Sequence, residues 1–502
     1  MSFFRMQGDF ITNLPKIYGF YTGGFIIFIL LMAILEQFGV GARTIGILFV
    51  AFTIVIYALI GWLSRTMQID AYYVAGRTVP PVFNGMATAA DWMSGASFVA
   101  MAGGIFFGGH SYLAFVVGWT GGYVLVAVLM APYLRKFGCY TVPDFIGTRY
   151  GGNTARLFAV LVLVLASFTY VTAQINATGT IASRALGVPF EVGVWFGLMG
   201  ILLCSMLGGM RAVTWTQVAQ YIVLIIAYLV PVIWMSNKQG FGVIPQFVYG
   251  DAVARLTDLE TLHQVGQLKP VAGVAATFPG LKALTVAHST AGDSAMYSWK
   301  FVTLVACMML GTASLPHILM RYFTTPSVRA ARTSVAWSLF FITLLYFTAP
   351  ALATFTKLQI LDPNLATSII GKTFGDVANI EWVKNWIEVG MLAIKDANAD
   401  GILQINEFFM RGDIVVLATP EIAGLPYVIS GLVAAGGMAA AMSTADGLLL
   451  AIANALSHDL YYKIIDPKAE TKKRLIVARV LLIVIGAAGA LVASMKLTGI
   501  LG

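Results

Sequence analysis

Charged residues are scarce in this sequence. They make up 11% of its 502 residues, whereas hydrophobic residues make up 59% and the mean hydropathy is +0.83. Soluble globular domains carry about 25% charged residues, so the composition excludes that class. The apolar residues form runs of about 20, the length that a helix needs to cross a membrane. The sequence therefore predicts an all-α polytopic membrane protein.

Signatures of enzymes and of ATP-driven pumps are also missing. The three cysteines and five histidines show neither metal-ligand spacing nor an HExxH motif. No glycine loop is followed by a Walker lysine. We therefore expect no enzyme and no ATP-driven motor. The net charge of +8 is explained by loops between spans and does not indicate a nucleic-acid partner.

Apolar runs predict about eleven membrane spans. They lie near 19–35, 44–64, 84–108, 112–131, 155–180, 190–208, 213–236, 298–318, 333–355, 425–453 and 474–496. Alternate loops collect basic residues: Arg65, Arg77, Arg135, Lys136, Arg149, Arg211, Arg321, Arg329, Arg332, Lys463, Lys468, Lys472, Lys473 and Arg474. Because basic loops stay on the cytoplasmic side, these loops and the N-terminus are expected inside the cell. The long segments 237–297 and 356–424 then lie outside.

Two predicted spans are rich in small and polar residues. Spans 84–108 and 425–453 are dense in Gly, Ala, Ser and Thr, and each contains an acid. Small residues permit close helix packing, which is the simpler interpretation. Interrupted helices with polar middles also expose carbonyls and hydroxyls to cations in secondary transporters. An acid inside a membrane is costly, so Asp91 needs a role. It either caps the second half of such a broken helix or takes part in binding or coupling.

Adjacent hydroxyls at Ser443 and Thr444 suggest a cation site. Hard monovalent cations prefer oxygen ligands, and hydroxyls together with freed carbonyls supply them without excess charge. The alternative is that both hydroxyls bond the preceding helical turn, which is common in membrane helices. The spacing alone does not separate the two.

Five stretches resemble the sodium:solute symporter family, whose core is the inverted-repeat fold of the bacterial leucine transporter. They are "DAYYVAGR" at 70–77, "RKFGCYTVPDFIGTRYG" at 135–151, "LGGMRAVTWTQVAQ" at 207–220, "SLPHILMRYFTTPSVRAARTS" at 314–334 and "MSTADGLLLAIANALSHDLY" at 442–461. Within the family, "PHILMRYFT" and "SHDLY" are most similar to the cation/acetate symporter branch, which carries short monocarboxylates. The resemblance covers most of the chain beyond residue 66.

The resemblance implies a sodium site and a nearby substrate site. The sodium ligands would be the carbonyls of Ala90, Met93 and Ala440 and the hydroxyls of Ser443 and Thr444. By location, substrate or coupling roles fall to Asp91, Ser94, Gly95, Ser97 and Gln217. Several family members place an acid where this sequence has Gln217, so sodium and proton coupling both stay open.

The resemblance also divides the chain. Two N-terminal spans (1–66) precede the first core repeat (67–236), an external loop (237–297), the start of the second repeat (298–355), an external segment (356–424) and the remainder of the second repeat (425–502). By the family pattern the last core helix is missing from this sequence, so we expect either a shortened chain or a second subunit that completes the core.

One polar stretch, "DANADGILQINE" at 396–407, matches a calcium loop. The expected ligands are Asp396, Asn398, Asp400, Ile402 through its carbonyl, Gln404 through a water and Glu407. Gly401 stands where the loop needs its sharp turn. The apolar residues Val383, Ile387, Met391 and Ile394 predict an entering helix, and "QINEFFMRGD" a short exiting one. The alternative is a solvated acidic turn.

Together these features predict a cation-coupled symporter that takes up a small organic solute, and the resemblance implies a short monocarboxylate such as acetate. Sodium is the expected coupling ion, with calcium at the external loop. The expected location is the inner membrane of a bacterium, with the N-terminus in the cytoplasm. A transporter-like sensor that signals through a partner protein is the alternative.

Overall fold

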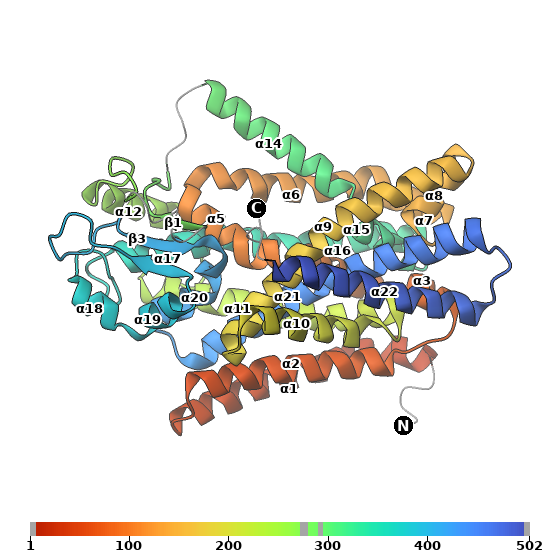
Figure 1. The fold of residues 1–502 in the computed structure, drawn as a ribbon, viewed down its shortest axis with the longest axis horizontal. Coiled ribbons are helices and arrows are strands. Elements are labelled where there is room, and N and C mark those ends of the chain that lie inside the picture. The colour runs from red at the N-terminus through yellow and green to blue at the C-terminus, as the bar shows by residue number, and fades with distance from the viewer. Residues whose placement is uncertain (1–6, 272–279, 290–294, 496–502) are drawn as a thin grey trace.

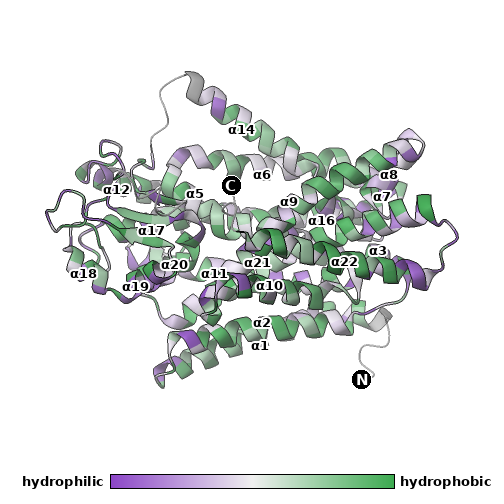
Figure 2. Ribbon diagram, viewed as in Figure 1, coloured by the Kyte–Doolittle hydropathy of each residue, from purple (hydrophilic) through white to green (hydrophobic). Residues whose placement is uncertain are grey.

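The computed structural model describes residues 7–271, 280–289 and 295–495. Most long helices run along one common direction, and short helices and a small sheet gather at the left end of the view (Figure 1). Hydrophobic residues dominate the middle of the molecule, whereas hydrophilic residues are more frequent towards its two ends (Figure 2). This distribution fits a protein that crosses a membrane, since the hydrocarbon core admits few polar groups.

The helices of the first half begin with two long N-terminal ones. Their bounds are α1 Gln7–Gln37, α2 Ala42–Leu63, α3 Ile69–Val74, α4 Pro81–Trp92, α5 Met101–Gly108, α6 Leu113–Leu125, α7 Ala131–Phe137, α8 Val142–Tyr150, α9 Asn153–Leu186, α10 Phe190–Ser205 and α11 Gly209–Lys238. Tyr18 on α1 donates a hydrogen bond of 2.7 Å to the carbonyl of Trp215 on α11, so the N-terminal pair is attached to the core.

The second half repeats the pattern of a broken helix followed by long ones. Its bounds are α14 Ala295–Ala313, α15 Pro316–Leu319, η6 Met320–Thr324, α16 Val328–Tyr346, α17 Thr348–Leu361, α21 Tyr427–Asn454, η8 Ala455–Ile465 and α22 Thr471–Ser494. Helix α21 packs against α9, α11 and α2. Every residue of α21 from Met438 to Asn454 is buried, so this helix lies at the centre of the bundle.

Two helices break where they approach each other. Helix α4 ends at Trp92, and Met93 leaves the helical conformation with φ −79° and ψ 68° before a π-helical turn, η3 Ala96–Ala100, leads into α5. Helix α14 ends before Pro316, which has no backbone N–H to continue it. The chain bends there by 50°. The prediction of interrupted spans is confirmed for 84–108 and wrong for 425–453, which forms the unbroken helix α21, whereas 298–318 is interrupted.

Fewer helices meet a length criterion for membrane spans than the eleven predicted. Within the described ranges, eight helices are long and apolar enough, and the bent pair Ser298–Ala313 and Pro316–Thr324 makes a ninth. The other two predicted spans are 84–108, whose first part is only the 12 residues of α4, and 190–208, where α10 has 16 residues. The all-α membrane fold is confirmed.

The two long segments between spans form one layer at the left end of Figure 1. Its elements are α12 Tyr249–Leu262, α18 Phe374–Asn379, α19 Glu381–Glu388, α20 Val415–Ile422, β1 Leu281–Ala283, β2 Leu392–Ile394 and β3 Phe408–Arg411. The strands pair antiparallel in the order β1-β3-β2, so they join parts of the chain that are far apart in sequence. Buried Lys357 of α17 pairs with Glu260 of α12 and ties this layer to the bundle.

The flanks predicted for the calcium loop are wrong. The entering helix ends at Glu388, before Met391 and Ile394, and the exiting segment is strand β3. The apolar residues at helical spacing instead divide between α19 and β2, because β2 pairs with β3 across the loop. Tertiary pairing has overridden the local helical pattern.

A close backbone contact between α5 and the short turn η7 Gly412–Ile414 gives a test of this packing. A Cβ at Gly103 would overlap the carbonyl of Gly412. We expect Gly103→Ala to lower the stability in detergent by about 1–3 kcal/mol, measured by thermal unfolding. Gly24→Ala is the control, because a Cβ at Gly24 of α1 meets nothing within 4 Å. Equal stability of the two variants would contradict the contact.

Candidate functional site

The hydroxyls of Ser443 and Thr444 lie against the end of α4. Ser443 Oγ donates to the carbonyl of Ala90 at 2.7 Å and is 2.9 Å from that of Ala440. Thr444 Oγ1 donates to the carbonyl of Asp91 at 2.9 Å. Both side chains are fully buried. These hydroxyls therefore bridge two helices, and are not engaged only with the preceding turn of their own helix.

The predicted sodium ligands come from the two segments that meet here. Ala90 and Met93 lie at the broken end of α4, and Ala440, Ser443 and Thr444 lie on one turn of α21. All of them offer oxygen atoms, and the donor set carries no formal charge. Such a set suits a hard monovalent cation, whose hydration shell it can replace.

Asp91 does not act as a helix cap. The structure gives no side-chain cap to η3 or α5, and the Asp91 carboxylate accepts a hydrogen bond of 2.9 Å from Nε of Arg321. Both side chains are 0% exposed. Arg321 was expected in a cytoplasmic loop, and that expectation is wrong. Its segment folds back into the bundle after Pro316, where Asp91 offsets its charge.

Gln217 connects this ion pair to the helix that carries the hydroxyls. Its side-chain oxygen accepts from the Arg321 guanidinium, and its Nε2 donates to the carbonyl of Ser443 at 2.7 Å. Thr214, one turn earlier on α11, accepts from Arg321 at 3.1 Å. An amide suits this bridge because it accepts and donates at once.

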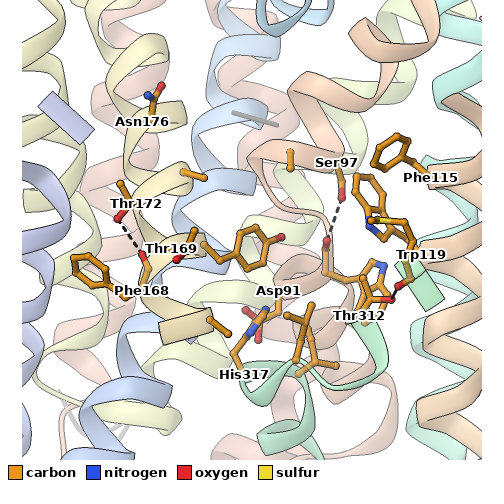
Figure 3. A pocket seen from close by; sticks show the side chains of 18 of the residues that line it. Asp91, Ser97, Phe115, Trp119, Phe168, Thr169, Thr172, Asn176, Thr312 and His317 are labelled. Carbon is orange, nitrogen blue, oxygen red and sulfur yellow. Dashed lines mark hydrogen bonds between the residues drawn. The ribbon is translucent and has the colours of Figure 1, made fainter. Parts of the chain in front are cut away.

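A cavity of about 670 Å³ lies between the two helix breaks. Asp91 and His317 form one wall, Ser97, Phe115 and Trp119 another, and residues of α9 a third (Figure 3). Its volume lies in the range of small-molecule sites, about 300–1,000 Å³.

The other predicted substrate residues lie at the same break. The hydroxyls of Ser97 and Tyr346 share a hydrogen bond of 2.9 Å beside the cavity. The backbone N–H of Gly95 donates to Gln174 of α9 at 2.8 Å, and Ser94 Oγ accepts from the N–H of Ser97 at 3.3 Å. Of these three residues, Ser97 lines the cavity, whereas Ser94 and Gly95 shape the break behind it.

Sequence reasoning missed Arg321, which pairs with Asp91, and His317, which lines the cavity. Arg321 was counted among loop charges, and His317 among scattered histidines, although both stand in the "SLPHILMRYF" stretch that carried the family resemblance. The Leu-Pro step directly before His317 was the available signal, because a proline ends a helix and leaves the residues that follow at a break. Tyr346 and Trp119 offered no such signal, because aromatic residues are common in any apolar span.

The predicted calcium residues form a compact loop between β2 and β3. Asp396 accepts from the N–H of Gly401 at 3.1 Å, and Gly401 has the expected positive φ of 75°. Glu407, which is 1% exposed, accepts from the N–H groups of Ala397 at 2.8 Å and Gln404 at 3.1 Å. The fold therefore turns residues 396 and 407 into one loop, as the motif requires.

Other side chains of this loop bond to one another. Asp400 accepts from Asn398 and Gln404, each at 2.8 Å, and from the N–H of Ile402 at 2.8 Å. The N–H of Ile402 is the main cause that lowers the pKa of Asp400 below its ordinary value. Among the described residues, three acidic or histidine side chains come within 4.8 Å of one another only at Asp144, His458 and Asp459. The three loop carboxylates, Asp396, Asp400 and Glu407, are therefore not gathered this closely.

The fold and site define a secondary transporter: two broken helices face each other across a buried cavity, beside a cluster of neutral oxygen ligands. The sequence model of the sodium:solute symporter family matches residues 72–397 and 387–500. The chain therefore belongs to this family, which places it among sodium-coupled solute transporters and not among enzymes.

Known relatives agree with this assignment. An uncharacterized symporter of Cupriavidus necator is 42% identical over 572 aligned residues, which cover 98% of this chain and 83% of the relative. An uncharacterized symporter of Bacillus subtilis is 29% identical over 62% of this chain and 57% of its own. A solved structure of a Na+-coupled sialic acid symporter, substrate-bound and outward-open, has the same fold, with a TM-score of 0.63 and 16% identity over 91% of this chain and 82% of its own.

Removing one partner of the buried pair should cost more than removing both. Asp91→Asn leaves the Arg321 charge buried without its carboxylate, which costs about 3–5 kcal/mol. The double variant Asp91→Asn, Arg321→Met should recover much of that loss, because no unpaired charge is left. Thermal unfolding in detergent measures the stability of the single and the double variant. Uptake should be lost in both variants. If Asp91→Asn alone keeps wild-type stability and uptake, the pair has no such role.

Proposed function

We propose that this protein couples an inward sodium gradient to the uptake of a short monocarboxylate such as acetate. The observation that carries the proposal is the position of Ser443 and Thr444, whose hydroxyls meet the carbonyls of Ala90 and Asp91 at the break of α4. A cation bound there would replace these hydrogen bonds with oxygen–cation contacts. Membership of the family supports sodium as that cation.

The solute would bind in the central cavity. Its wall carries few polar groups and several aromatic ones, among them Trp92, Phe115 and Trp119. An apolar wall with a small number of placed polar groups is typical of small-molecule sites. The preference for a monocarboxylate rests on the resemblance of "PHILMRYFT" and "SHDLY" to the acetate branch.

The cation and the solute would be linked through the broken helix. Asp91 contributes its carbonyl to the Thr444 contact and also lines the cavity, and its carboxylate holds Arg321 of the second broken helix. A cation that orders the end of α4 therefore also orders one wall of the cavity. Such shared ordering gives positive coupling between two ligands.

We place the N-terminus and the α8 end of the bundle in the cytoplasm of a bacterium. The basic residues of the short loops support this orientation. The layer that contains β1, β2 and β3 then faces the outside. The two bacterial relatives support a bacterium as the source of this protein. A sensor without transport activity is the competing function, and net uptake into sealed vesicles excludes it.

We also propose that the external loop 396–407 binds calcium. The oxygen atoms of Asp396, Asn398, Asp400 and Glu407 are the ligands that calcium prefers, and the turn at Gly401 has the required conformation. The hydrogen bonds within the loop would be exchanged for bonds to the ion. Because the loop lies in the β2–β3 hairpin, bound calcium would stiffen the external layer without touching the sodium ligands.

Loss of the two hydroxyls should weaken sodium binding. In Ser443→Ala, Thr444→Ala, half-saturating sodium for uptake should rise about tenfold or more, which corresponds to at least 1.4 kcal/mol. Alanine suits a packed helix, so folding should survive. The control is Thr53→Ala on α2, where the buried hydroxyl bonds only its own helix. Unchanged sodium dependence in the double variant would reject the site.

Calcium should raise the unfolding temperature of the purified protein. Extracellular calcium modules bind at about 10⁻⁴–10⁻³ M, and a ligand that prefers the folded state stabilises it by mass action. Glu407→Gln should remove the shift, whereas Glu388→Gln, at the end of α19 and outside the loop, should keep it. Absence of any shift up to about 10 mM calcium would refute the site. A tenfold change in uptake rate would refute a purely structural role.

A further inference from the structure

His317 is a buried histidine that forms no hydrogen bond with the residues that the structure describes. It is the second residue of α15, directly after the break between α14 and α15, and it lines the central cavity beside Asp91 (Figure 3). Its side chain is 1% exposed, and neither Nδ1 nor Nε2 has a partner among the described residues. The ring of Tyr170 packs edge-on against it, with 5.8 Å between ring centroids.

Two unpaired nitrogens in a buried position are costly. An unsatisfied buried polar atom costs about 1–3 kcal/mol, and an apolar ring of similar size would avoid that cost. Most buried polar atoms in proteins are paired, so exceptions call for an explanation. A ligand in the adjoining cavity would supply the missing partner.

Several hydroxyls around the cavity are already engaged, and the unpaired Oδ1 of Asp91 can only accept a hydrogen bond. The hydroxyls of Ser97 and Tyr346 bond each other. Thr169 and Thr172 donate to carbonyls of their own helix at 3.0 and 2.9 Å. Thr312 does the same at 2.5 Å. A ligand that needs a strong donor therefore finds it at the ring of His317.

A carboxylate ligand suits the donor of His317 because the charge of the acceptor strengthens the hydrogen bond. The Arg321 guanidinium lies one turn further along the chain, but its charge is paired with Asp91 and its N–H groups are held by Asp91, Gln217 and Thr214. A neutral imidazole offers one N–H donor, and a hydrogen bond from it to a carboxylate is stronger than one between neutral groups.

We propose that His317 binds the carboxylate of the transported solute through its ring N–H, while the aromatic wall at Trp92, Phe115 and Trp119 holds the apolar part. This role rests on the proposed uptake of monocarboxylates. His317 is then the residue that selects an acid over its uncharged amide, and it acts on the solute and not on sodium.

The test compares His317→Phe, which keeps an aromatic ring without a donor, with His317→Gln, which restores an N–H donor. Uptake of radiolabelled acetate, propionate and pyruvate is measured in proteoliposomes under a sodium gradient. His317→Phe should raise KM at least tenfold, the size expected when a hydrogen bond to a charged group is lost, with half-saturating sodium within twofold of wild type. His317→Gln should recover at least part of the loss.

Competition identifies the group that His317 binds. In the wild type, unlabelled acetate should inhibit uptake much better than acetamide, and in His317→Phe this preference should shrink at least tenfold. The control is His263→Phe, at the end of α12 outside the cavity. This variant should leave the KM for the acids and the half-saturating sodium concentration unchanged. His263 bonds the carbonyl of Leu361 at 3.0 Å.

The outcomes separate this role from the proposed function. If the wild type takes up none of the three acids, the proposed monocarboxylate function fails, and the role of His317 fails with it. If the wild type takes them up and His317→Phe has an unchanged KM, only the role of His317 is overturned. A change in half-saturating sodium without a change in KM would also overturn it.

Discussion

The buried ion pair between Asp91 and Arg321 is the constraint on which the centre of this protein depends. Taking two charges out of water costs several kcal/mol per ion, and this cost is offset only when both groups are well satisfied. Here Arg321 also bonds Thr214 and Gln217, so α4, the α15–η6 segment and α11 are held together at one point. Asp91 lines the cavity and accepts from Thr444 through its carbonyl, and Gln217 donates to the carbonyl of Ser443. Because these residues contact both the cavity and the hydroxyl cluster, a structural change at one of the two sites also affects the other.

Much of this arrangement could be predicted from sequence because it depends on the pattern of residues within short stretches of the chain. Apolar runs predicted the helices, whereas small residues with an acid marked both 84–108, which breaks after α4, and 425–453, which is the unbroken helix α21. Ser443 and Thr444 stood out because two adjacent hydroxyls are unusual in a helix of Gly and Ala. The structure brings them to Ala90 and Asp91, more than 350 residues earlier in the chain.

What could not be predicted depends on distant pairing. Arg321 follows a predicted span, where a basic residue normally marks a cytoplasmic loop, and only the fold reveals that its chain segment turns back to meet Asp91. The same holds for the sheet, whose strands are three or four residues long and come from two separate segments. The helices expected on both sides of the calcium loop were wrong for this reason, since strand pairing across a hairpin leaves no periodic signal over so few residues.

The central claim is that a sodium gradient drives uptake of a short monocarboxylate, and imposing gradients separately tests it most directly. Purified protein in sealed proteoliposomes is given radiolabelled acetate with an inward sodium gradient alone, with an inward proton gradient alone, or with neither. The account predicts accumulation above equilibrium with the sodium gradient and only background uptake under the other two conditions. Accumulation driven by the proton gradient in the absence of sodium would contradict it.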